Sequence, residues 1–210
     1  MLSRQKGREE HACRAGPHGP YSLFANYEFE AQRMELKTQD LIVLLKVAAH
    51  PPRRWTYAEL STALSMSASE THASVKRAVE CGLAVSHGRD GWQPVRPALL
   101  EFLLHGVKYV WPAALGPVKR GVPTSIGAEP LASQVNVAPG DKPVWPHPHG
   151  TAKGPSISPL YRTAPDAALR DLDLYRLLAL LDAVRCGRAR ERALAADMLS
   201  RELGGAHASE

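Results

Sequence analysis

Cysteine is scarce in this sequence, and the few cysteines are poorly placed for cross-links or metal sites. Three occur among the 210 residues, Cys13, Cys81 and Cys186, and no CxxC pair is present. A disulfide framework usually shows an even number of cysteines, and a zinc finger needs paired ligands, so neither is indicated. A reducing cytoplasm is the simplest setting for such a chain.

Long apolar runs are missing too. The longest, residues 41–49, is interrupted by Lys46 and is too short to span a bilayer. Residues 1–6 include charged side chains, but the apolar run that a signal peptide requires does not follow them. We therefore expect a cytoplasmic protein that has no membrane partner.

Motifs for common enzyme chemistries are absent as well. The sequence contains no nucleophile elbow, phosphate-binding P-loop, GxGxxG turn or paired-carboxylate arrangement. His147 and His149 form an H-x-H spacing that Asp141 precedes, but the adjoining prolines favour a simple loop over a metal site. We expect no enzyme activity, no cofactor and no bound metal.

A strong excess of one charge is also lacking, since 26 basic and 21 acidic residues leave a formal net charge of +5. The excess lies in the middle of the chain. Residues 36–110 carry nine basic and six acidic groups, and residues 111–165 carry five and two. A polyanionic partner would favour this distribution, although an ordinary soluble protein can carry the same excess.

Three segments do not have the pattern of regular helices. Residues 1–20 are polar and broken by glycine and proline, which predicts a disordered tail. Residues 21–35 gather aromatic side chains, which predicts an arm that covers the core or reaches a second subunit. Residues 112–165 hold 11 of the 17 prolines, which predicts a proline-rich extended connector with Trp145 and Tyr161 as packed anchors.

Helical periodicity marks the other two segments, residues 36–111 and 166–204. The first opens on a helix whose leucines recur at helical spacing and whose first turn holds Asp40, where the helix dipole favours a carboxylate. In the second, two apolar stripes meet at Gly187 and predict a C-terminal helical hairpin.

Two capping boxes predict the order of the next helices. A T-x-x-E box occupies residues 56–59, and an S-x-x-E box occupies residues 67–70. In each box the hydroxyl accepts a backbone N–H while the glutamate reaches back to the cap. The second helix is expected over residues 68–81, where Gly82 supplies a left-handed stop. A short helix, a tight turn and a longer helix form a helix-turn-helix.

A hairpin is predicted directly after this pair of helices. Residues 83–87 have the character of a short strand, residues 88–91 of a turn, and residues 92–95 of a returning edge strand. Together, residues 83–95 would form a wing. Pro97 then suits the first turn of a closing helix.

The segments W-T-Y-A-E-L-S, S-x-S-E and V-K-R-A-V-E-C-G-L-A carry a family resemblance. This region resembles the winged helix-turn-helix regulators of bacteria, including the MarR type, over about 60 of the 210 residues. The resemblance implies a mainly α fold with a small β-hairpin wing, followed here by the connector and the helical hairpin. It also implies a sequence-specific transcriptional regulator, which we expect to be a repressor that binds double-stranded DNA as a homodimer.

Periodicity divides the predicted recognition helix into two faces. One face is apolar and would pack on the core, and it comprises Thr71, Val75, Ala78 and Val79. A recognition helix presents its opposite face to the major groove. With the helix starts and the wing, the candidate DNA contacts are Thr56, Ser67, Ser69, His72, Ala73, Lys76, Arg77, His87 and Arg89.

Each candidate is assigned a contact by its chemistry. Ser69 and His72 suit base edges, and Ala73 suits a thymine methyl group. Lys76 and Arg77 suit phosphates or guanine. The helix starts at Thr56 and Ser67 offer backbone N–H groups to phosphates. At the wing, Arg89 could enter a minor groove, with His87 nearby.

Two other interpretations remain open from the sequence. The polar residues of the second helix could simply be solvated. Alternatively, the chain could be a protein-interaction adaptor, or an antitoxin-like regulatory subunit whose protein partner is encoded by a neighbouring gene. The long extension beyond Trp111 favours the adaptor, because a bare repressor does not need it.

Overall fold

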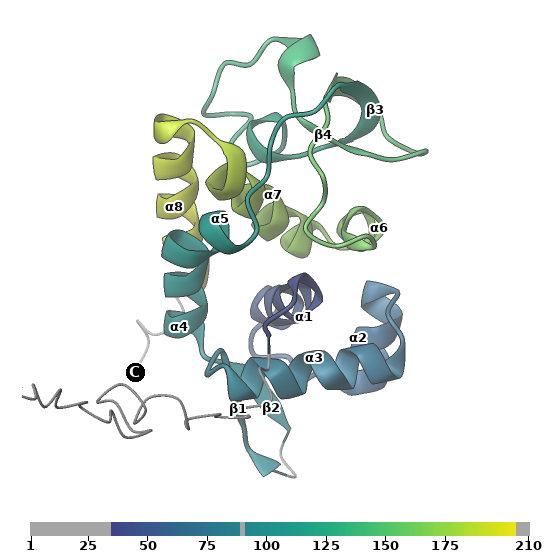
Figure 1. Cartoon of the computed structure of the whole chain (residues 1–210), viewed down its shortest axis with the longest axis vertical. Coiled ribbons are helices and arrows are strands. Elements are labelled where there is room, and N and C mark those ends of the chain that lie inside the picture. Colours follow the sequence, from purple (N-terminus) through teal and green to yellow (C-terminus); the bar gives the residue numbers. More distant parts are fainter. Residues whose placement is uncertain (1–34, 89–90, 205–210) are drawn as a thin grey trace, which may run out of the picture. The chain divides into compact units, whose positions relative to one another are not determined.

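The computed structural model describes residues 35–88 and 91–204, and this part of the chain is mainly helical (Figure 1). A small antiparallel two-stranded sheet accompanies the helices. The predicted tail at residues 1–20 and all but the last residue of the predicted arm at residues 21–35 lie outside the described residues. Within those residues, no helix has both the length and the apolar character to cross a membrane.

The first three helices are α1 (Thr38–Ala48), α2 (Tyr57–Leu64) and α3 (Ala68–Glu80). Both expected capping boxes are present, because Thr56 and Ser67 accept backbone N–H groups while the glutamate three residues on bonds back to each cap. The chain turns between α2 and α3 at Ser65, which has a left-handed φ of 51°.

A hairpin and a second helical stretch follow. Strand β1 (Ala84–Ser86) pairs with β2 (Trp92–Pro94) in antiparallel register, with Val85 opposite Gln93. Helix α4 (Arg96–Glu101) continues through a wider π-helical turn into α5 (Val107–Val110). The hairpin and the helix after it therefore lie where the sequence predicts them.

Residues 112–165, expected to form an extended connector, instead contain a three-stranded antiparallel sheet, and their last two residues already belong to a helix. Its strands are β3 (Val118–Pro123), β4 (Val144–Pro146) and β5 (Ala152–Pro155), in the order β4-β3-β5. Glycine permits the close crossing of these segments. A Cβ on Gly121 would lie 1.9 Å from the Trp145 carbonyl oxygen, and one on Gly154 would lie 1.9 Å from that of Lys142.

The chain ends its described part in helices α6 (Ala164–Arg170), α7 (Leu172–Cys186) and α8 (Ala189–Gly204). Helix α7 is buried along most of its length and contributes to one hydrophobic core with residues of α1, α3 and the β-sheet. The expected anchors both pack on this core, since Trp145 is buried and Tyr161 is half-buried.

Candidate nucleic-acid interface

Helix α3 has one buried face and one exposed ridge. Thr71, Val75 and Ala78 are buried, as the periodicity predicts, and Val79 is half-buried beside them. The opposite side carries Ser69, His72, Lys76 and Glu80 in exposed positions and Ala73 in a half-buried one. The residues expected to read bases therefore lie together on one accessible surface.

A hollow of about 250 Å³ borders this ridge. It is lined by the first turn of α2, the middle of α3 and the hairpin, through Tyr57, His72, Val75, Lys76, Val79, Glu80, Ser86 and Trp92. The rings of Tyr57 and His72 lie 5.2 Å apart. Tyr57 and Trp92 were not predicted as site residues. From the sequence alone, an aromatic side chain at the start of a helix or strand is expected to pack in the core.

Lys76 and Arg77 are adjacent in sequence but have different environments. The Lys76 side chain is 63% exposed, and its ammonium lies 3.9 Å from the Glu80 carboxylate. The Arg77 side chain is 11% exposed, and its guanidinium donates two hydrogen bonds, of 2.8 and 2.6 Å, to the buried Asp40. Hydrogen bonding to Asp40 raises the pKa of Arg77. A DNA contact by Arg77 would have to break this ion pair, so we assign it a structural role.

The two helix starts are acidic as well as capped. At α3, Glu70 accepts the backbone N–H and the hydroxyl of Ser67 at 2.9 and 2.8 Å. These hydrogen bonds lower the pKa of Glu70, which therefore stays ionised at neutral pH. At α2, Glu59 binds Thr56 in the same way. A phosphate near Thr56 or Ser67 would meet this negative charge, which opposes the predicted contacts there.

The far flank of α3 is occupied by residues from the C-terminal part of the chain. The Tyr161 hydroxyl lies 3.1 Å from the Glu70 carboxylate, and the Arg162 guanidinium lies 3.3 Å from it. Arg170 donates to the Ser65 hydroxyl in the turn before α3 at 2.8 Å. No local pattern could have revealed these contacts, because they join residues about a hundred positions apart in the sequence.

The hairpin supplies the remaining predicted contacts. His87 is exposed after β1, and its backbone N–H donates to the Gly91 carbonyl at 2.8 Å. Arg89, expected at the wing tip, lies outside the described residues.

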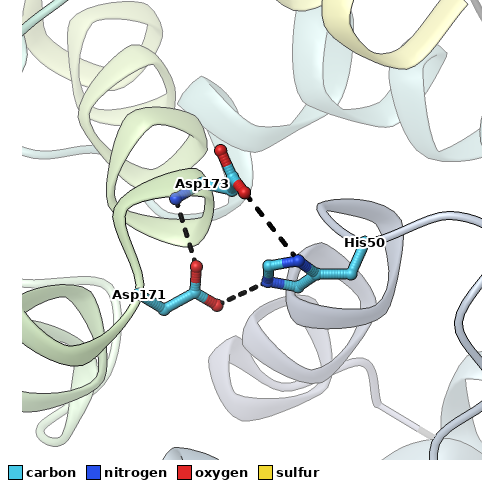
Figure 2. Close-up of side chains that lie close together, drawn as sticks. All are labelled: His50, Asp171 and Asp173. Atoms are coloured by element: carbon cyan, nitrogen blue, oxygen red, sulfur yellow. Dashed lines mark hydrogen bonds and ion pairs between the residues drawn. The ribbon is translucent and has the colours of Figure 1, made fainter.

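A different cluster joins α1 to α7 and has the composition of a metal site. His50 lies between Asp171 and Asp173, at 2.7 and 3.8 Å from their carboxylate oxygens (Figure 2). However, Asp171 is already engaged: one oxygen accepts Lys46 and His50, and the other accepts the backbone N–H groups of Asp173 and Leu174. A cation would have to displace the Lys46 ammonium, so this cluster is an ion-pair link between the two helices.

The H-x-H pair, His147 and His149, lies near one acidic side chain. His147 lies 3.1 Å from Asp166, and the rings of His147 and His149 are 5.6 Å apart. Within residues 35–88 and 91–204, no further histidine, cysteine or acidic side chain brings a ligand atom to both histidines.

Comparisons with protein-family models, with curated proteins and with solved structures find no match for this chain.

Proposed function

We propose that residues 36–111 bind double-stranded DNA as a winged helix-turn-helix, and that the protein regulates transcription, with repression as the expected outcome. Helix α3 would enter the major groove, and the β1–β2 hairpin would act as the wing. The observation that carries this proposal is the exposed ridge of α3, which bears Lys76 and is bordered by the first turn of α2 and by the hairpin.

Helix α3 is held in a fixed position by two sets of contacts, which supports the same function. Direct readout requires side chains that are held in place before DNA arrives. The capping box at Ser67 fixes the start of α3, and the Arg77–Asp40 ion pair ties its C-terminal half to α1. Ser69, His72 and Ala73 are then the base-reading residues, and Lys76 is the phosphate contact.

A selection experiment tests this proposal. Full-length protein is incubated at about 50 mM salt, where phosphate contacts are strong, with duplexes that have a random core and with the promoter of its own gene. We expect one sequence to be enriched and His72→Ala to relax the preference at one base pair. His105→Ala, an exposed histidine on the α4–α5 stretch, is the matched control and should leave the preference unchanged. Failure to bind any duplex at this salt concentration would refute the proposal.

Exposed apolar side chains favour a protein partner as a second function. Four lie within ten residues of one another: Tyr109 is 76% exposed, Val110 53%, Leu115 58% and Val118 59%. We infer that these residues contribute to one apolar patch, which would suit a protein interface and fits both the expected homodimer and the adaptor. Sedimentation of the pure protein tests the homodimer, which forms without any other chain, and a pull-down from the native host tests the adaptor, which requires a stoichiometric protein partner.

A further inference from the structure

A second hollow, of about 530 Å³, lies between the turn after α1 and strand β2 of the hairpin. Its basic lining residues are Arg53, Arg54, His87 and Arg96, and we call it the basic hollow. None of the described residues that line it is acidic. Its other walls are largely apolar and include Trp92 and three prolines. A lining of this kind suits an organic anion, whose charge meets the cations while its body packs on the apolar walls.

Arg96 contributes a half-buried positive charge to this lining. Its guanidinium donates to the carbonyl oxygens of Ala48, Glu202 and Leu203 at 2.9, 2.8 and 2.8 Å. In the described part of the chain, no carboxylate lies within ion-pair distance of it. Burial lowers the pKa of Arg96, because loss of water disfavours the charged form. The carbonyls satisfy its hydrogen bonds, but an anion in the basic hollow would also compensate its charge.

Arg53 is oriented by an aromatic ring before any ligand arrives. Its guanidinium lies 3.8 Å from the centre of the Trp55 ring, a contact that restricts the side chain. One of its five N–H groups donates to Glu59 at 3.1 Å, and Glu59 does not line the basic hollow. His87, which follows β1, is exposed and adds an imidazole. A single ligand could therefore contact both the turn after α1 and the hairpin.

We propose that the basic hollow binds the phosphate group of a small phosphorylated molecule. Phosphate is favoured over a carboxylate because it carries about two negative charges and three acceptor oxygens, which suit several cations. A small molecule is favoured over DNA because no residue of α3 lines the basic hollow, which shares only Trp92 with the hollow beside that helix. The volume agrees, since ligand pockets commonly measure about 300–1,000 Å³. This site is additional to the proposed function and does not rest on it.

Calorimetric titration tests the site. Full-length protein without DNA is titrated with inorganic pyrophosphate and with AMP at constant ionic strength. We expect at least one of these probes to bind with a Kd of about 1 mM or below. Arg53→Gln should weaken this binding about 5-fold, because it removes a charge-assisted hydrogen bond to phosphate. His87→Gln should also weaken it. Arg96 is less suitable for substitution, because it also joins the end of α1 to the end of α8.

Arg201→Gln and His105→Gln are the matched controls. Arg201 resembles Arg53 in being exposed and paired with one carboxylate, that of Asp197, but it does not line the basic hollow. His105 resembles His87 in being exposed, and it also lies outside the lining. Both controls should bind pyrophosphate and AMP like the wild-type protein. Weaker binding by Arg53→Gln or by His87→Gln than by its control would support the site.

Two results would overturn the inference. The first is that neither probe binds, or that both variants bind the probes as their controls do. The second is that the variants keep their affinity for the probes but reduce the salt slope of duplex binding by about 0.9 per lost contact, which would assign the basic hollow to DNA phosphates. The proposed function is tested separately, because the titrations contain no DNA. A protein that binds a probe but no duplex would keep this site and lose the proposed function.

Discussion

Among the described residues, Asp40 in residues 36–111 is 0% exposed and Asp182 in residues 112–204 is 1% exposed, and the two carboxylates find their partners in different ways. Asp40 is paired with Arg77, a bidentate partner on a helix that packs against its own. Asp182 accepts the Thr124 hydroxyl, the Trp145 indole N–H and the Arg185 guanidinium. Asp40 therefore fixes one helix against another, whereas Asp182 gathers β4, α7 and the chain after β3 around a single point.

The two arrangements differ in which groups lose their partner when a side chain is replaced. Loss of one partner leaves a buried charge uncompensated, which usually costs more than the pair itself contributes. Removal of Asp182 leaves three groups from separate segments without their hydrogen-bond acceptor. Removal of Arg77 leaves a single buried carboxylate without its cation. Four substitutions, taken from the largest expected effect to the smallest, test this contrast.

Asp182→Ala should lower the free energy of unfolding by about 3–5 kcal/mol, because it leaves Arg185, Thr124 and Trp145 without their acceptor. Urea unfolding at neutral pH measures this loss. Asp197→Ala is the control, because Asp197 is half-exposed on α8 and its pair with Arg201 should contribute less than about 1 kcal/mol. Equal effects of the two substitutions would contradict the anchoring role of Asp182.

Arg77→Ala should destabilise the protein by about 3 kcal/mol, because Asp40 would remain buried without its cation. Lys76→Ala, one residue away, should change stability by less than about 0.5 kcal/mol. Thermal unfolding of both variants measures the difference. A stable, folded Arg77→Ala protein that binds DNA poorly would instead make Arg77 a DNA contact.

Asp171→Asn should weaken the link between α1 and α7 and lower stability by about 2 kcal/mol at neutral pH. Burial raises the pKa of Asp171, but hydrogen bonds from Lys46 and His50 outweigh burial, and the net pKa is lowered. A lowered pKa contributes stability above the ordinary carboxyl value, and this contribution is lost as the pH falls below that value.

The pH dependence provides a second readout for this residue. Between about pH 7 and pH 3, wild-type protein should lose more stability than Asp171→Asn, because the variant lacks the titrating carboxylate. Asp166→Asn, in an exposed pair with His147, should follow the wild-type curve closely. Parallel curves for wild type and Asp171→Asn would show that the link contributes nothing.

Tyr161→Phe has the smallest expected effect, about 0.5–1 kcal/mol, because it removes one hydrogen bond to the partly exposed Glu70. Tyr109→Phe is the matched control, since Tyr109 is 76% exposed and should tolerate the change. If Tyr161→Phe matches this control in thermal unfolding, the contact of the C-terminal part with α3 adds no stability.

Local signals account for most of what the sequence predicts correctly. The capping boxes at Thr56 and Ser67 fix two helix starts to the residue, because each box is complete within four positions. The break at Gly187 likewise separates α7 from α8. The sheet of β3, β4 and β5 was missed because its strands are short, rich in proline and paired across more than twenty residues.

The candidate site is predictable to a similar degree. Helical spacing identifies the exposed ridge of α3, including Ser69, His72 and Lys76. The same spacing leaves Arg77 at the margin of that ridge, and only its long-range pairing with Asp40 assigns it to the interior. Tyr161 and Arg162 could not be foreseen, since nothing local marks them as neighbours of Glu70.

The salt dependence of DNA binding by Lys76→Ala is the most direct test of α3 as the reading helix. Binding through α3 predicts that the slope of log K against log salt falls in magnitude by about 1, with affinity reduced evenly across sequences. Lys119→Ala, an exposed lysine on β3, should keep the wild-type slope. A folded Lys76→Ala protein with the wild-type slope and affinity would contradict DNA binding through α3.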